Sequence, residues 1–242
     1  MRILITNDDS ISSSVLPRFV KWAMGLGEVT VVVPKHEQSG KSQALDFRIA
    51  VEVKRVDLVD GCEAYTVDST PADCVRFAVT GLKREYDVVF SGINCGYNIG
   101  DDIAYSGTIG AIFEASRLGL KAIAFSTGFD TFDYAMSEID KVYSYIEENR
   151  LLDKVDLLNV NFPLCKSRGI SITRQGGMFF SDDFVDCGND MYKQVGEPVD
   201  DGCRDISIDI PAVRQGYVSI SPLTSCKTDL VGFEKLKNMN LQ

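Results

Sequence analysis

The chain of 242 residues lacks several features that define common classes of protein. It contains one histidine, and its seven cysteines include no C-x-x-C pair, so the sequence has no pattern of a structural zinc site. No apolar run reaches the roughly 18 residues that a membrane span needs. The first apolar segment follows Arg2 at once, which leaves no room for a signal peptide. We therefore expect a cytoplasmic protein whose cysteines are thiols.

Positive charge is scarce as well. The sequence has 25 Lys and Arg residues against 35 Asp and Glu residues, a formal net charge of -10. Proteins that bind long nucleic acids need a basic stripe, and the sequence has none. A small phosphorylated ligand is still compatible with this charge, because a metal ion and backbone amides bind such a ligand locally. The hydrophobic content of 45% is ordinary for a globular protein, which excludes disordered and collagen-like chains.

Two adjacent acids at the end of an apolar run are the most informative feature that is present. Residues 3–5 predict a buried strand, and Asp8 and Asp9 follow at its end. Two buried carboxylates repel each other, so a cation beside them would offset the free energy that their burial costs. Oxygen ligands favour a hard ion such as Mg²⁺, Mn²⁺ or Ca²⁺. The alternative is an Asx turn in which Asp9 or Ser10 is the N-cap of the next helix.

Strand and helix patterns alternate along the first two thirds of the chain. Helical spacing from Val15 to about Gly25 connects the first strand to a β-branched strand at residues 29–33, which predicts a βαβ unit. Similar patterns predict strands at residues 86–90, 121–126 and 157–163. They also predict three helices: one that begins at Thr70, one that begins near Tyr105, and one that spans residues 132–148. These elements predict an α/β fold: a doubly wound, mostly parallel, Rossmann-like sheet over residues 1–165.

Two regions depart from this alternation. Residues 47–56 and 63–67 predict an antiparallel hairpin with its turn near Asp60-Gly61. Residues 166–242 predict a smaller, irregular β/α extension. Its expected elements are short strands at residues 170–174, 205–210 and 216–221 and a closing helix at residues 228–237. This extension is too short and broken to be an independent catalytic domain, so we expect it to cover the site or to mediate contacts between subunits.

Polar segments follow the strand ends, where open α/β sheets bind their ligands. Residues 35–42 end in Gly-Lys-Ser but lack the earlier glycine of a P-loop. Residues 91–102 carry a glycine every four residues, which is not dinucleotide-binding spacing and suits close contact with a small ligand or a hard metal. The next helix carries Ser106, Gly107 and Thr108 in its first turn, where unpaired amides favour an anion. The alternative is that Ser106 or Thr108 is only an N-cap.

Eight segments together resemble the family of SurE survival proteins. They run in order over nearly the whole chain, at residues 5–9, 38–40, 70–75, 91–94, 96–98, 105–108, 158–163 and 216–219. The resemblance implies a metal-dependent phosphatase that hydrolyses nucleoside 5'- and 3'-monophosphates with one divalent ion, Mg²⁺ or Mn²⁺, per subunit. It also implies a homodimer or homotetramer in which subunits exchange C-terminal segments.

The resemblance also implies which residues form the site. The implied metal ligands follow different strands: Asp8, Asp9, Ser39 and Asn94. The implied phosphate-binding residues begin one helix: Ser106, Gly107 and Thr108. Asn98 would lie close to the phosphate and act in catalysis together with Asp8 and Asp9. Either acid would orient or deprotonate the attacking water or, alternatively, attack phosphorus directly.

Other interpretations account for parts of the pattern. A metal-binding receiver or ligand-sensing module without turnover also has an acid pair after its first strand, and Asp68 would be its phosphoacceptor, but such a module is much shorter. A haloacid-dehalogenase phosphatase needs acids two positions apart, and Ser10 occupies the second position. His36 is a candidate general acid for the leaving group, although a solvent-exposed loop histidine is the commoner case.

Overall fold

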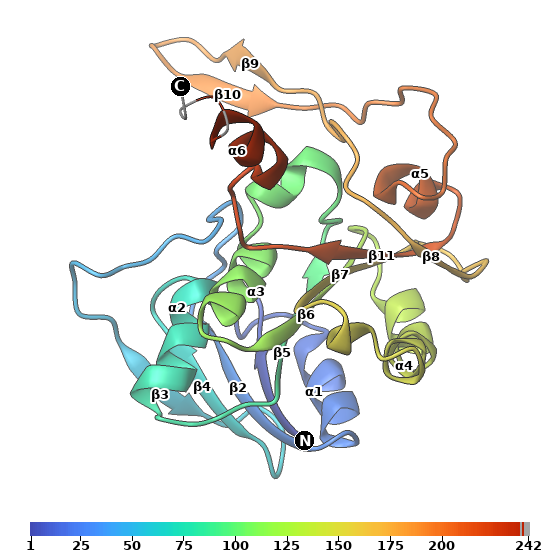
Figure 1. Ribbon diagram of the computed structural model, residues 1–242. Helices are drawn as coiled ribbons and strands as arrows, with labels where there is room; N and C mark the ends of the chain where they lie inside the picture. The colour runs from blue at the N-terminus through green and yellow to red at the C-terminus, as the bar shows by residue number, and fades with distance from the viewer. Residues whose placement is uncertain (238, 240–242) are drawn as a thin grey trace.

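The computed structural model describes residues 1–237 and residue 239, and its centre is a sheet of nine strands (Figure 1). The strand order is β3-β4-β2-β1-β5-β6-β7-β11-β8. Six neighbouring strands are mutually parallel. In spatial order they are β4 (Glu63–Val67), β2 (Glu28–Pro34), β1 (Arg2–Thr6), β5 (Val88–Cys95), β6 (Lys121–Thr127) and β7 (Leu157–Phe162). The predicted α/β class with a mostly parallel sheet is confirmed.

The strand order reverses between β1 and β5. From β1 the chain adds β2 and β4 in one direction, and it then returns to add β5, β6 and β7 in the other. Doubly wound sheets bind their ligands outside the carboxyl ends of the strands at such a switch point. The crevice expected to hold a ligand therefore lies where β1 and β5 end.

Strands of mixed direction extend both edges of the sheet. β3 (Val53–Val56) pairs antiparallel with β4, which confirms the predicted hairpin, although its first arm is shorter than residues 47–56. On the other side β11 (Val218–Leu223) runs antiparallel to β7, and β8 (Ile170–Ile172) pairs parallel with β11. Residues beyond 165 thus continue the same sheet, and the division of the chain at that point stays a prediction.

Helices cover both faces of the sheet (Figure 1). α1 (Leu16–Met24) and α4 (Asp133–Glu148) bury their apolar sides on one face, and α2 (Pro71–Arg76) and α3 (Gly107–Arg117) pack on the other. Phe19 of α1 packs edge-on against Phe125 of β6, with ring centroids 5.6 Å apart. Thr70 caps α2 as expected, since its side chain accepts a hydrogen bond from the backbone of Asp73. Three short helical turns complete this part: Phe77–Gly81, Gly100–Ala104 and Leu151–Asp153.

The predicted strand at residues 205–210 is wrong. Helix α5 (Asp209–Arg214) begins there, and only Ile208 forms an isolated bridge, to Arg174. Isoleucines occupy alternate positions in this segment, which is the apolar spacing of a half-buried strand. Pro211, however, has no N–H for a strand ladder and is well tolerated in the first turn of a helix.

The rest of the extension is partly as expected. The closing helix is confirmed as α6 (Leu230–Lys237). A polar stretch that showed no strand pattern contains a separate hairpin, β9 (Asp183–Asp186) with β10 (Tyr192–Val195). The end of the predicted extension, residue 238 and residues 240–242, lies outside the described residues. Within the described residues, no helix combines the length and the apolarity needed to cross a membrane.

Candidate active site

Asp8 and Asp9 lie directly beyond β1, at the switch point of the sheet. Val15 is the N-cap of α1, so the alternative in which Asp9 or Ser10 caps that helix is wrong. Asp8 is only 5% exposed. Burial raises the pKa of both carboxyls, and burial together with the charge of Asp8 raises the pKa of Asp9 to about 6. The ionised pair is therefore unfavourable by itself, and a cation beside it would relieve the repulsion.

The first turn of α3 lies against Asp8. The Thr108 hydroxyl donates to Oδ1 of Asp8 at 2.5 Å, and hydrogen bonds from Thr108 partly oppose the rise in the Asp8 pKa. Gly107 permits this approach, because a Cβ on it would lie 3.0 Å from Cβ of Asp8. Ser106 is the N-cap of α3, since its Oγ accepts a hydrogen bond from the Ile109 backbone at 3.1 Å. The structure thus brings the predicted phosphate-binding turn to the predicted metal ligands.

The end of β5 holds the second acid. The backbone N–H of Cys95 donates to Oδ2 of Asp9 at 3.0 Å. Asn94 precedes Cys95, and its Nδ2 donates to the carbonyl of Gly96 at 2.8 Å. The amide nitrogen is used in this bond, so Oδ1 is the atom that Asn94 offers to a cation. Asn94 therefore lies next to the backbone N–H that binds Asp9, which places these two predicted ligands close together.

The loop after β2 reaches the same place. The backbone N–H of Gln38 donates to the carbonyl of Asp8 at 2.8 Å, which brings the neighbouring Ser39 toward the acid pair. The Ser39 hydroxyl donates to Oε1 of Glu37 at 2.7 Å. The charge of Glu37 adds a smaller rise to the pKa of both Asp8 and Asp9. Sequence analysis did not select Glu37, although its place beside Ser39 in a loop at a strand end was the available signal.

Asn98 is held against the ends of other strands. Its Nδ2 donates to the Ser126 hydroxyl on β6 at 2.8 Å, and its backbone N–H donates to Oδ1 of Asn161 on β7 at 2.9 Å. Asn159 in turn donates to the Asn98 carbonyl at 2.8 Å. None of these hydrogen bonds reaches the acid pair. Ser126, Asn159 and Asn161 were given no role from the sequence, although both asparagines lie in the segment 158–163 that resembles the SurE family.

The side chains at the switch point fit a hard divalent cation. Two carboxylates, one amide oxygen and one hydroxyl come from three strand ends, and all are oxygen donors. Oδ1 of Asn7, next to Asp8, is a further buried oxygen with no hydrogen-bond partner among the described residues. The described part of the chain contains no group of three or more His, Cys, Asp or Glu side chains suited to a metal ion. The predicted set includes only two carboxylates, so its other ligands must be neutral oxygens.

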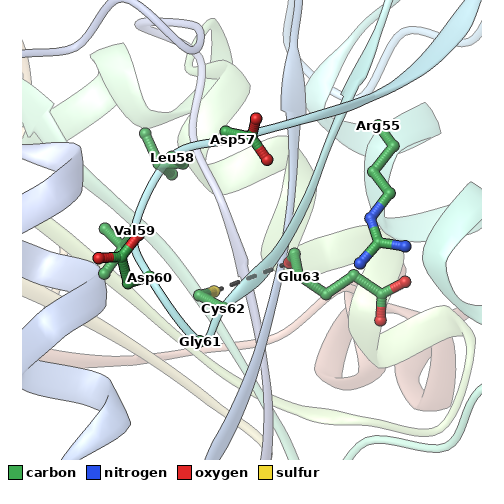
Figure 2. A pocket seen from close by; sticks show the side chains of 8 residues that line it. All are labelled: Arg55, Asp57, Leu58, Val59, Asp60, Gly61, Cys62 and Glu63. Carbon is green, nitrogen blue, oxygen red and sulfur yellow. Dashed lines mark hydrogen bonds between the residues drawn. The ribbon is translucent and has the colours of Figure 1, made fainter.

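A cavity of about 510 Å³ lies elsewhere, at the turn between β3 and β4 (Figure 2). Its lining comes from that one turn, from Arg55 to Glu63. Because β4 begins at Glu63 and runs in the direction of β1, the turn lies at the opposite edge of the sheet from Asp8. Cavity size therefore does not locate the site in this protein, whereas the strand ends do.

Residues 3–182, which include all of the predicted site residues, match the family described as Survival protein SurE. A protein of Pseudothermotoga lettingae named 5'-nucleotidase SurE is 36% identical over 232 residues, which cover 93% of this chain and 89% of that protein. A protein of Alkaliphilus metalliredigens with the same name is 35% identical over 258 residues and covers 100% of both chains. The crystal structure of the SurE protein from Aquifex aeolicus has a TM-score of 0.81 at 32% identity, covering 99% of each chain.

Proposed function

Because the chain belongs to the Survival protein SurE family, we propose that it is a metal-dependent phosphomonoesterase that hydrolyses nucleoside 5'-monophosphates to nucleoside and phosphate. Its relatives are named 5'-nucleotidases, and we extend the proposal to 3'-monophosphates. The observation that carries the proposal is the contact between Asp8 and the first turn of α3 at the switch point. Through this contact, the acid pair that would hold the cation lies against the helix turn that would bind the phosphate.

The proposed cation, Mg²⁺ or Mn²⁺, would be held by Asp8, Asp9, Oδ1 of Asn94 and Oγ of Ser39. The Ser39 hydroxyl donates a hydrogen bond to Glu37, which fixes the rotation of the hydroxyl and leaves the lone pairs of Oγ for the ion. A bound divalent ion would neutralise charge on the phosphate and lower the pKa of a water. We expect Glu37 to act only through Ser39 and through its charge.

The phosphate would bind at the amino end of α3. This helix has 11 residues, and its first-turn amides and dipole favour an anion. The Thr108 hydroxyl already donates to Asp8, whereas the Ser106 Oγ accepts from the Ile109 backbone and keeps its O–H for another acceptor. The proposed donors to the phosphate are therefore the Ser106 hydroxyl and backbone N–H groups of the turn. The second N–H of the Asn98 amide, beyond the one bonded to Ser126, would hold a further phosphate oxygen.

Asp9 is the better placed acid to take a proton from the attacking water. It is partly exposed, whereas Asp8 is buried and its Oδ1 accepts the Thr108 hydroxyl. Direct attack of a carboxylate on phosphorus is the second possibility. His36 is exposed in the loop after β2 and stays a candidate donor of a proton to the leaving nucleoside.

Metal binding to this site should weaken at low pH. Because burial and the charge of Asp8 raise the Asp9 pKa to about 6, Asp9 of the metal-free protein carries a proton below that pH. That proton must leave before the ion binds. We expect the affinity for Mn²⁺ to fall by about tenfold for each pH unit below 6 through Asp9 alone, and to be flat above about pH 7. Calorimetric titration at about pH 5 and about pH 7.5 measures the difference.

A matched variant checks the source of this pH dependence. Asp9→Asn removes the titrating group, so its affinity should be low and should vary less with pH than that of the wild type. Equal wild-type affinities at the two pH values would contradict the assignment of Asp9 as a ligand.

The enzyme and the receiver interpretations differ in turnover. An enzyme releases many equivalents of phosphate from 5'-AMP, whereas a receiver would keep about one phosphoryl group on Asp68. The structure places Asp68 in an ion pair with Lys35, 3.3 Å away, after β4. Incubation with 5'-AMP, 3'-AMP and acetyl phosphate, followed by assays of free phosphate and of phosphoprotein, tests the two. Stable phosphoprotein without repeated release of phosphate would overturn the proposed function.

We also propose a homodimer or homotetramer formed through C-terminal segments. The hairpin β9–β10 and helix α6 carry exposed large apolar side chains, which a partner subunit would cover. They include Phe184, Val185, Tyr192, Leu230, Val231, Phe233 and Leu236. Removal of residues from 228 onward should then lower the mass seen by light scattering, and an unchanged mass would contradict this route of assembly.

All seven cysteines are free thiols, which supports a reducing compartment such as the cytoplasm.

A further inference from the structure

Phe129 is an exposed aromatic residue beside the candidate active site. It lies just beyond the end of β6, the neighbour of β5, and 67% of its surface is exposed. A phenylalanine in that position gains little from the hydrophobic effect. Isolated exposed apolar side chains are common, so exposure alone does not indicate a role. The contacts of the Phe129 ring do indicate a role.

The ring of Phe129 packs against Gly96, just beyond the end of β5, which carries the proposed metal ligand Asn94. A Cβ built on Gly96 would lie 3.0 Å from Cε1 and 3.1 Å from Cζ of the ring, and 3.7 Å from Nδ2 of Asn94. Gly96 also has a φ of 130°, which side-chain-bearing residues rarely adopt. The absence of a side chain at this position therefore lets the aromatic ring come close to Asn94.

The backbone of Phe129 is tied to the same loop. Its carbonyl accepts a hydrogen bond from Sγ of Cys95 at 3.7 Å, and the backbone N–H of Cys95 binds Asp9. A flat apolar surface is thus held against Gly96, one residue from the Cys95 backbone that binds Asp9, and most of this residue is open to solvent. This combination is unlike a core aromatic residue, and it resembles the platforms on which proteins stack nucleobases.

We propose that the base of the nucleoside monophosphate stacks on Phe129 while its phosphate lies at the acid pair and the amino end of α3. This inference rests on the proposed function. Stacking accepts every base, because each has a π-face, and no hydrogen-bonding group of Phe129 selects among them. The site therefore prefers nucleotides over sugar phosphates without a base, and it discriminates weakly between purine and pyrimidine substrates.

Two other exposed aromatic residues are the natural competitors. Tyr105 and Phe47 are 62% and 79% exposed. Tyr105 precedes the N-cap of α3, and its carbonyl accepts the backbone N–H of Ser42, on the side of the loop after β2. Phe47 lies in the segment between that loop and β3. Of these three residues, Phe129 is the one whose ring contacts Gly96 at the end of β5, so it is the assigned platform.

The test compares 5'-AMP with ribose 5-phosphate, which is the same substrate without its base. Phe129→Ala should lower kcat/KM for 5'-AMP by roughly 5- to 150-fold, the equivalent of about 1–3 kcal/mol, mainly through KM. Its kcat/KM for ribose 5-phosphate should stay within about twofold of the wild type, because no stacking is lost. Phe129→Trp should keep the preference for 5'-AMP.

Controls separate this inference from the proposed function. Tyr105→Ala and Phe47→Ala should leave the ratio of the two kcat/KM values near that of the wild type. An unchanged ratio in Phe129→Ala, or a loss of the ratio in either control alone, would overturn the assignment of Phe129 while the phosphatase stands. If the wild type turns over neither substrate, the proposed function fails. Calorimetric binding of 5'-AMP and ribose 5-phosphate then tests the platform with the same variants and the same expected ratios.

Discussion

Asp8→Asn is expected to lower phosphate release from 5'-AMP by roughly 10³-fold or more, because the loss of a ligand to a catalytic metal costs several kcal/mol of transition-state stabilisation. The substitution keeps the size of the side chain and an oxygen that accepts the Thr108 hydroxyl. Burial raises the pKa of Asp8, so the ionised form is unfavourable in the metal-free protein. The thermal midpoint of the metal-free variant should therefore equal or exceed that of the wild type.

A loss of turnover without a loss of thermal stability separates a functional role of Asp8 from a structural one. Asp153→Asn is a matched control, since Asp153 is half exposed and forms ion pairs with Lys121 and Arg150, both near the surface. It should change neither turnover nor stability by much. An Asp8→Asn protein that retains wild-type turnover, or one that loses turnover only because it is unfolded, would contradict the assignment of Asp8.

Asp209→Ala is expected to lower the free energy of unfolding by about 3–5 kcal/mol, because it removes one buried acceptor from several backbone donors. The Asp209 carboxylate accepts the N–H groups of Gly100 at 2.9 Å, Gly176 at 2.8 Å and Ile210 at 2.7 Å. It thereby joins α5 to the segment that follows Asn98. Turnover of 5'-AMP should fall as well, since Asn98 loses part of its support. Urea unfolding measures the first effect.

Two variants refine this expectation. Asp209→Asn keeps one oxygen acceptor, so its loss of stability should be smaller than that of Asp209→Ala. Asp205→Ala removes an exposed carboxylate that accepts one N–H, from Ser207, and should be nearly neutral. A free energy of unfolding for Asp209→Ala within about 1 kcal/mol of the wild type would show that other contacts hold the extension in place.

Local patterns were sufficient to predict the central sheet. β1, β2, β5 and β6 are continuous apolar runs, which a sheet buried on both faces requires, and the helices that separate most of the central strands give them one direction. Once the strands are parallel, polar residues at the carboxyl ends of β1 and β5 must meet at one edge of the sheet. The resemblance to the SurE family named Asn94 as a partner of Asp8 and Asp9, and the hydrogen bond from Cys95 to Asp9 shows that the ends of β1 and β5 do lie together. The ligand set itself stays a prediction.

The extension was less predictable, because its structure depends on contacts distant in sequence. The first turn of α5 is supported by Gly100, which is 109 positions away from Asp209, and no local pattern reveals that bond. β9 and β10 are short and fully exposed, so they lack the apolar alternation by which strands are recognised.

Some features of the site are equally non-local. Thr108 was predicted to bind phosphate, but its hydroxyl donates to Asp8, a partner 100 positions earlier in the chain. Glu37 gained its significance only when the loop after β2 was seen to bond to Asp8 through Gln38. Sequence patterns predict which strand ends lie close together. Which donor binds which acceptor at those strand ends depends on side-chain geometry, which the patterns do not contain.

We propose that Asp8 and Asp9 form half of a metal-dependent phosphatase site. The most direct measurement is phosphate release from 5'-AMP by the wild-type protein before chelation, after chelation, and after addition of Mn²⁺ or Mg²⁺ in excess of the chelator. The account predicts that chelation abolishes multiple turnover and that the added ion restores it in the wild type but not in Asp8→Asn. Turnover that is unchanged by chelation, or equal restoration in Asp8→Asn, would contradict it.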